Sequence, residues 1–149
     1  MKNPPVMNAW VQLVRAHAHL VGSVEKALGA QGFPPLRWYD VLLELERRDA
    51  PMRAHELQGE LLLEQYNLSR LLDRMEAKAL IARVPDPDDG RSKLVSPTPE
   101  GRSLRKRMWP VYLDAVSRAV EGVLDQEQVE QLADLLRRLA SQPEQGRKP

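Results

Sequence analysis

The 149-residue sequence contains no cysteine. This absence excludes disulfide bonds, thiolate zinc sites and every cysteine-based redox switch, and it leaves the compartment open. No stretch approaches the ~20 apolar residues that cross a bilayer, and the first ten residues, MKNPPVMNAW, lack the apolar run of a secretory signal. We therefore expect a cytoplasmic protein with no membrane association.

Aromatic residues are also few: three Trp, three Tyr and one Phe. The core must then consist mostly of Leu, Val and Ala, which favours helices. Positive charge is barely in excess, because 22 Lys and Arg stand against 21 Asp and Glu. A net charge of +1 gives no indication of nucleic-acid binding, so a DNA-binding protein of this composition must segregate its positive side chains.

Patterns for catalysis or metal binding are sparse. The histidines His17, His19 and His55 form no i, i+4 pair and have no Ser or Cys partner pattern. No Gly-rich phosphate loop is present, and the carboxylates are scattered over helical surfaces. We expect a protein that is not an enzyme and has no cofactor. A metal site completed by carboxylates around His17 or His55 is the open alternative.

Apolar spacing predicts one mainly helical domain over residues 1–149. Two strand-like runs, 81–84 and 93–96, flank a turn made of Asp, Pro and Gly at 86–90. Pro85 and Pro97 confine these runs to edges or ends of a sheet. The predicted helices span about 8–28, 35–48, 54–61, 65–79, 99–123 and 126–140.

The predicted helix over 65–79 is the best-patterned stretch of the chain. Its apolar side carries Leu68, Leu71, Leu72, Met75 and Ala79. The outer side is polar and basic, of the kind that enters the major groove of DNA. The candidate DNA contacts on this helix are Gln65, Asn67, Ser69 and Arg70, with Arg74 placed to meet phosphate. The alternative interpretation is an ordinary solvated helix face.

The predicted hairpin follows this helix directly and carries Arg91 and Lys93 just past the turn. These two side chains are candidates for contacts with phosphate or the minor groove. The acidic residues of the turn are expected to hold its shape, Asp89 by bonds to the backbone and by pairing with Arg91. Asp73 is expected to be neutralised by an arginine, with Arg91 as the candidate, so that helix and hairpin are fixed together.

The segment NLSRLLDRMEAKALIARVPDPDDGRSKLVSPTPEG resembles the recognition helix and wing of the MarR-type winged-helix transcription regulators. The matching features are Asp73-Arg74 in the helix, an Asp-Pro-x-Asp-x-Arg wing motif ending at Arg91, and Thr98 with Gly101 opening the next helix. Gly90 and Ala79 depart from the family pattern, which has a basic residue and a glycine at these positions. Pro97 likewise stands where the family has a leucine.

The resemblance implies a mainly α fold: a winged helix-turn-helix lobe over about 36–101, with a small β-hairpin wing. Helices at about 8–28 and 99–140 would form a homodimer that binds a palindromic site in double-stranded DNA. Such regulators are often repressors released by a small aromatic or phenolic effector. The candidate lining of an effector pocket is Trp10, His17, Trp38, Tyr39 and Trp109. The alternatives are that these side chains belong to the core, and that the protein is a helical protein–protein interaction module.

Overall fold

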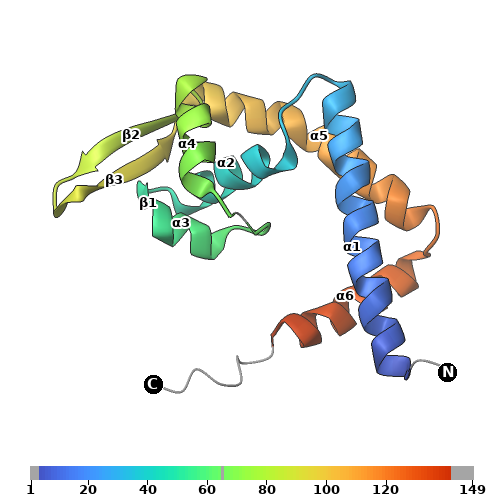
Figure 1. The fold of residues 1–149 in the computed structure, drawn as a ribbon. Helices are drawn as coiled ribbons and strands as arrows, with labels where there is room; N and C mark the ends of the chain where they lie inside the picture. Colours follow the sequence, from blue (N-terminus) through green and yellow to red (C-terminus); the bar gives the residue numbers. More distant parts are fainter. Residues whose placement is uncertain (1–3, 65, 142–149) are drawn as a thin grey trace, which may run out of the picture.

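The computed structural model describes residues 4–64 and 66–141 and is mainly helical, with one small sheet (Figure 1). The expected winged helix-turn-helix arrangement is confirmed. The elements in chain order are α1 (Pro5–Ala30), α2 (Leu36–Arg48), β1 (Met52–Arg53), α3 (Ala54–Glu60), α4 (Leu68–Ala77), β2 (Ile81–Asp86), β3 (Asp89–Pro97), α5 (Pro99–Glu121) and α6 (Gln126–Ala140).

The sheet is antiparallel with the order β1-β3-β2, so that β3 is central and the other two strands lie at the edges. Residue 52 pairs with Val95, and Ile81 pairs with Pro97. Both wing strands are longer than the sequence predicted, since β2 continues through Pro85 to Asp86. An edge strand tolerates this proline because its missing N–H can face away from the ladder. The two-residue strand β1 was not predicted.

The core of the lobe forms around α2. Val41, Leu42 and Leu45 have no measurable exposure, and they pack with apolar side chains of α3, α4, α5 and the sheet. Burial of each such side chain contributes roughly 1.5–3 kcal/mol. The core is largely aliphatic, as the small aromatic content requires.

The boundaries of α1 and α4 differ most from those that the sequence pattern predicted. The helix expected from residue 8 begins at Pro5, which suits a first helical position because its missing N–H has no helical partner. The helix expected over 65–79 spans Leu68–Ala77. Asn67 caps its start, and Ala79 lies beyond its end with φ of 58°, the left-handed region that favours glycine. Ala79 is therefore exposed rather than part of the apolar face.

Helices α1, α5 and α6 extend away from the lobe, and the wing projects at the other end (Figure 1). Only Val24 and Leu28 of α1 are buried, where α1 packs on α5, and no residue of α6 is buried. Apolar side chains therefore remain exposed along both helices. We call the following set the terminal apolar face: Val6, Met7, Trp10, Leu13, Val14, Leu132, Leu135 and Leu139.

Candidate nucleic-acid interface

Helix α4 has one buried apolar side and one side that is exposed to solvent. Leu68, Leu71, Leu72 and Met75 are buried, as the helical spacing predicted. The candidate contact residues are on the other side of the helix or at its start. Asn67, Ser69, Arg70 and Arg74 are all exposed, and Gln65 lies outside the described residues.

Asn67 also caps the start of α4, a role that was not predicted from the sequence. Its Oδ1 accepts a hydrogen bond from the backbone N–H of Arg70 at 3.3 Å, the bond of a helix N-cap. The cap defines where α4 starts and leaves the side-chain amide nitrogen of Asn67 free to donate. Asn followed by a Leu-rich helical run is a cap signal that the sequence does contain.

Arg83 of β2 fixes the wing to α4. Its Nη2 lies 2.5 Å from Oδ1 of Asp73 and 3.2 Å from Oε1 of Glu76, and its Nε donates to Oε2 of Glu76 at 3.2 Å. These bonds raise the pKa of Arg83, and the same guanidinium holds the pKa of Glu76 below its usual range. One guanidinium thus pairs with both carboxylates on the outer side of α4 and offsets one of their two negative charges.

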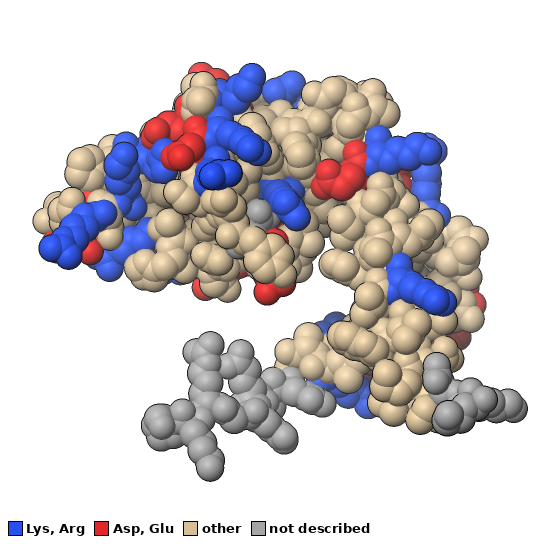
Figure 2. Space-filling view, in the orientation of Figure 1, with Lys and Arg blue, Asp and Glu red and all other residues tan. Residues whose placement is uncertain are grey.

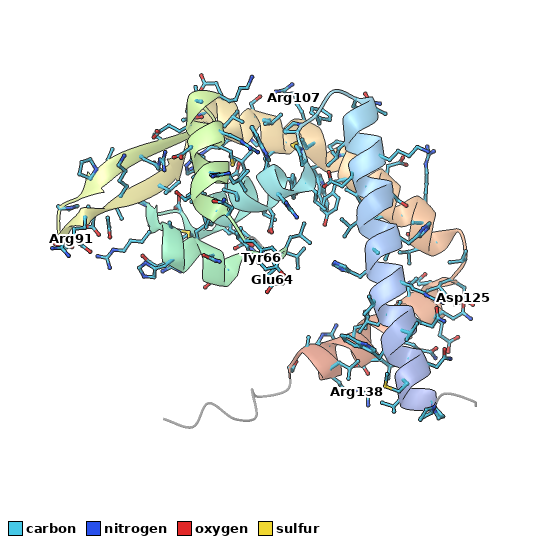
Figure 3. The ribbon with its side chains drawn as sticks, in the orientation of Figure 1. Glu64, Tyr66, Arg91, Arg107, Asp125 and Arg138 are labelled. Carbon is cyan, nitrogen blue, oxygen red and sulfur yellow. The ribbon has the colours of Figure 1, made fainter. Side chains whose placement is uncertain are left out.

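The prediction that Arg91 pairs with Asp73 is therefore wrong. Arg91 lies at the tip of the wing, far along the hairpin from α4 (Figure 3). Arg83 follows Ile81 by two residues and so lies on the same face of the strand. Because Ile81 is buried, that face is turned toward the lobe and brings Arg83 to α4. The two-residue period of β2 is a signal from which this role of Arg83 could have been predicted.

The wing turn is held by side-chain-to-backbone bonds. Asp86 Oδ1 accepts from the N–H of Asp88 at 2.9 Å, and Asp89 Oδ1 accepts from the N–H of Arg91 at 3.0 Å. Asp86 is buried and also forms an ion pair with Arg53, whose Nε lies 2.6 Å from Oδ2. The amide of Asp88 and the guanidinium of Arg53 hold the pKa of Asp86 below its usual range. The hairpin is thereby anchored to the start of α3.

Basic side chains are left free on the same lobe. Within the part of the chain that the structure describes, Arg70, Arg74, Arg91 and Lys93 form no ion pair. The expected ion pair of Arg91 with Asp89 is therefore wrong, because Asp89 bonds to Arg91 only through the backbone N–H of that residue. Figure 2 shows Lys and Arg gathered over the wing and beside α4, with acidic groups between them. The chain as a whole has almost no excess of positive charge, so it is the fold that brings these positive side chains to one surface.

A cavity of about 660 Å³ lies beside α4, between that helix, α1 and α2. His17 and Trp38 of the expected effector pocket line it together with Arg37, Arg70 and Arg74. We call it the basic cavity. Tyr66 and Glu64, near the start of α4, also belong to its lining (Figure 3).

The other expected pocket residues are elsewhere. Tyr39 and Trp109 line a second cavity of about 400 Å³ between α2, residues 60–63 and α5. Trp10 lines neither cavity and is 58% exposed as part of the terminal apolar face. The structure therefore divides the five candidates among three places.

No group of three or more His, Cys, Asp or Glu side chains in residues 4–64 and 66–141 is arranged to hold a metal ion. No helix in that part of the chain is long and apolar enough to cross a membrane.

Comparison with known proteins gives a consistent result. A family model described as "MarR family" matches residues 31–92. The chain is 29% identical over 107 residues to the uncharacterized HTH-type transcriptional regulator YkoM of Bacillus subtilis, covering 72% of this chain and 68% of YkoM.

Solved structures agree over nearly the whole length. Sco3205, a MarR family regulator from Streptomyces coelicolor solved in complex with DNA, superposes with a TM-score of 0.80 at 25% identity, covering 100% of this chain and 96% of Sco3205. Bordetella bronchiseptica BpsR, whose DNA binding is described as regulated by 6-hydroxynicotinic acid, superposes with a TM-score of 0.80 at 22% identity, covering 96% of this chain and 100% of BpsR.

Proposed function

This chain belongs to the MarR family of DNA-binding transcription regulators, and on that premise we propose that it is a homodimeric repressor that a small aromatic ligand releases from a palindromic operator. One observation carries the proposal. The free cations of α4 and the wing lie on one lobe, while Arg83 pairs with Asp73 and Glu76, the carboxylates beside them, and offsets one of their two charges. A phosphate backbone approaching this lobe therefore meets guanidinium and ammonium groups without an opposing bare carboxylate on α4.

The terminal apolar face supports the homodimer. A single chain leaves Trp10, Leu135 and Leu139 between 53% and 59% exposed, an arrangement that a second copy would bury. A twofold axis through this face would present two copies of α4 to one duplex. Recognition helices in such dimers lie about one DNA turn apart, ~34–36 Å, which matches a palindromic site.

The basic cavity supports ligand release. It joins an aromatic surface, Trp38 and Tyr66, to the guanidinium groups of Arg37, Arg70 and Arg74. A planar aromatic acid suits this lining because arginine binds carboxylates through paired N–H donors. The structure of BpsR connects one such acid with DNA binding in that protein. In this chain, a ligand that engages Arg70 and Arg74 would take both side chains away from phosphate.

The experiment is a fluorescence-anisotropy titration of DNA selected from a random library by the full-length protein. We expect binding that weakens steeply with salt, because each phosphate contact contributes about 0.9 to the slope of log K against log salt. Arg70→Ala and Arg91→Ala should each lower affinity, and Arg91→Ala should reduce the slope by about one. Arg118→Ala is the matched control, since Arg118 is an exposed arginine of α5 paired with Asp114.

Wild-type affinity in both lobe variants would refute the DNA-binding assignment. Absent or salt-insensitive binding would instead favour a helical protein–protein interaction module. Repeating the titration with 6-hydroxynicotinic acid and benzoate tests release. The proposal expects an aromatic acid to weaken DNA binding. The DNA affinity of an Arg37→Gln variant should respond less to the acid, because this variant lacks a guanidinium that lies outside α4 in the lining of the basic cavity and could bind the carboxylate of the ligand.

A further inference from the structure

The second cavity has a different chemistry from the basic cavity and contains no residue of α4. At about 400 Å³ it falls within the range of small-molecule sites. Neither DNA binding nor the aromatic-acid proposal uses it. We call it the acidic cavity, and its lining is Leu36, Tyr39, Asp40, Leu43, Glu44, Arg47, Glu60, Leu61, Leu62, Leu63, Trp109 and Tyr112.

One wall of the acidic cavity is aromatic. Tyr39 and Trp109 stack with ring centroids 6.2 Å apart and an interplanar angle of 18°. Tyr112 packs against both, with centroid distances of 5.1 and 5.8 Å. Trp109 nevertheless remains 43% exposed, so part of its indole is open to a ligand. The face of an indole attracts cations more strongly than the faces of other aromatic side chains.

Negative charge dominates the rest of the lining. The carboxylates of Asp40, Glu44 and Glu60 stand against one guanidinium, that of Arg47, which leaves a formal charge of −3 + 1 = −2. Arg47 pairs with Glu44 at 3.4 Å, and its side chain is 68% exposed, so this pair is screened by water. A cation entering the cavity therefore meets an excess of carboxylate.

Two tyrosines, Tyr39 and Tyr112, also line the acidic cavity. Tyr39 is only 4% exposed and lines the cavity, yet no hydrogen bond to its hydroxyl is formed within residues 4–64 and 66–141. The hydroxyl oxygen itself is not buried, so it is open to water or to a ligand that enters the cavity. Burial raises the pKa of Tyr112, and the neighbouring Tyr39 and Asp40 raise it further. The cavity thus disfavours an added negative charge.

We propose that the acidic cavity binds an organic cation, an amine or quaternary ammonium compound that carries an apolar or aromatic group. The cationic head is placed against Glu44, Glu60 and the indole of Trp109. The apolar group contacts the leucines of the lining, and the Tyr39 hydroxyl meets a polar atom of the ligand. This site is additional to the proposed function, and its binding does not depend on whether the protein binds DNA.

The site is also connected to the DNA-binding lobe. Asp40 accepts hydrogen bonds from the backbone N–H groups of Leu62 at 3.1 Å and Leu63 at 2.8 Å. These residues belong to the segment that leads into α4. A ligand beside Asp40 therefore lies next to the segment that positions α4. If the ligand changes the affinity for DNA, then DNA must change the affinity for the ligand by the same factor.

The test uses the full-length protein with Trp10→Phe and Trp38→Phe, so that Trp109 is the only tryptophan. Benzyltrimethylammonium is titrated while indole fluorescence is recorded, with benzyl alcohol as the neutral probe and benzoate as the anion. We expect saturable quenching by the ammonium compound and at least tenfold weaker binding of both other probes. The same ranking should appear in calorimetry of the unsubstituted protein.

Glu44→Gln and Glu60→Gln, separately and together, should weaken ammonium binding, the double variant by roughly tenfold. Glu64→Gln is the matched control, because Glu64 lines the basic cavity only. Circular dichroism of each variant establishes that it is folded, and the single variants replace the double if that one unfolds. Absence of saturable quenching up to about 10 mM, equal binding of benzyl alcohol, or unchanged affinity in the folded glutamine variants would overturn the proposal.

Discussion

Arg83 of β2 and Asp73 of α4 form an ion pair of 2.5 Å that joins the wing to the recognition helix. The Arg83 side chain is 14% exposed, so it lies well inside the lobe, whereas the Asp73 side chain is 62% exposed. One arginine thereby removes negative charge from a surface proposed to face phosphate and fixes the direction of the hairpin.

Replacing Arg83 with Gln should lower DNA affinity more than loss of a single phosphate contact would. The substitution leaves the carboxylates of Asp73 and Glu76 bare, and each repels phosphate. We expect roughly fivefold weaker binding in low salt, with a smaller difference in high salt because exposed charges are screened. Anisotropy titrations at two salt concentrations measure this. The Asp73→Asn/Arg83→Gln double variant should recover part of the affinity, and failure to recover any would contradict the charge argument.

Asp86 should make stability depend on acid. Its pKa is lower in the folded chain than in the unfolded chain, because the Asp88 amide and Arg53 stabilise the carboxylate. Its contribution is therefore complete above the unfolded pKa of about 3.9 and is lost as the pH falls through the folded value. The melting temperature of Asp86→Asn should lie below that of the wild type at pH 7, and the gap should narrow below about pH 4.

Asp134→Asn is the control for this series, since its ion pairs with Arg137 and Arg138 are exposed on α6. It should change the melting temperature little at any pH. A gap between wild type and Asp86→Asn that stays constant from pH 7 to pH 3 would show that the carboxylate charge is not the stabilising factor.

Gly101 should not tolerate a side chain. A Cβ at this position would collide with the carbonyl oxygen of Leu80 and lie 2.9 Å from Cδ2 of Leu42. We expect Gly101→Ala to lower the free energy of unfolding by about 3 kcal/mol. Gly22→Ala is the opposite case, since nothing lies within 4 Å of its Cβ in α1, and it should raise stability by about 0.5–1 kcal/mol. Urea denaturation of both variants checks the two signs.

The terminal apolar face should determine the oligomeric state. Leu135→Asp places a carboxylate in the centre of the apolar side of α6, where burial by a second chain would leave it unpaired. We expect the variant dimer to dissociate at protein concentrations at least tenfold higher than those at which the wild-type dimer dissociates. Sedimentation velocity measures both concentrations. Gln131→Asp adds the same charge on an exposed polar position of α6 and should leave the dimer intact. A monomeric wild type would refute the dimer.

The parts of this fold that depend on local spacing were predictable. The apolar side of α4, the turn of the wing and the Asp125–Gln128 capping box all follow from residues within a few positions of one another. Helix boundaries were less accurate, because α4 starts at the side-chain cap of Asn67 and stops before the positive φ of Ala79, and apolar spacing encodes neither feature.

Contacts between distant segments were not predictable in the same way. The bond of Glu25 to the N–H of Leu36 caps α2 from α1, and Arg53 reaches across 33 residues to Asp86. Nothing near these residues in the sequence identifies the partner. The five candidate effector residues all lie outside residues 53–101, but helix packing turns Trp38 and Tyr39, neighbours in the chain, toward different cavities.

The hydroxyl of Thr98 connects two helices through a single atom. It donates to the carbonyl of Ala79 at 2.7 Å, just past the end of α4, and accepts from the N–H of Gly101 at 3.0 Å in the first turn of α5. Since α5 continues from this point, past Pro110, into the proposed dimer region, a rotation of its first turn would also move the end of α4. In the proposed dimer, a rearrangement that moves this part of α5 would therefore change the spacing of the two copies of α4.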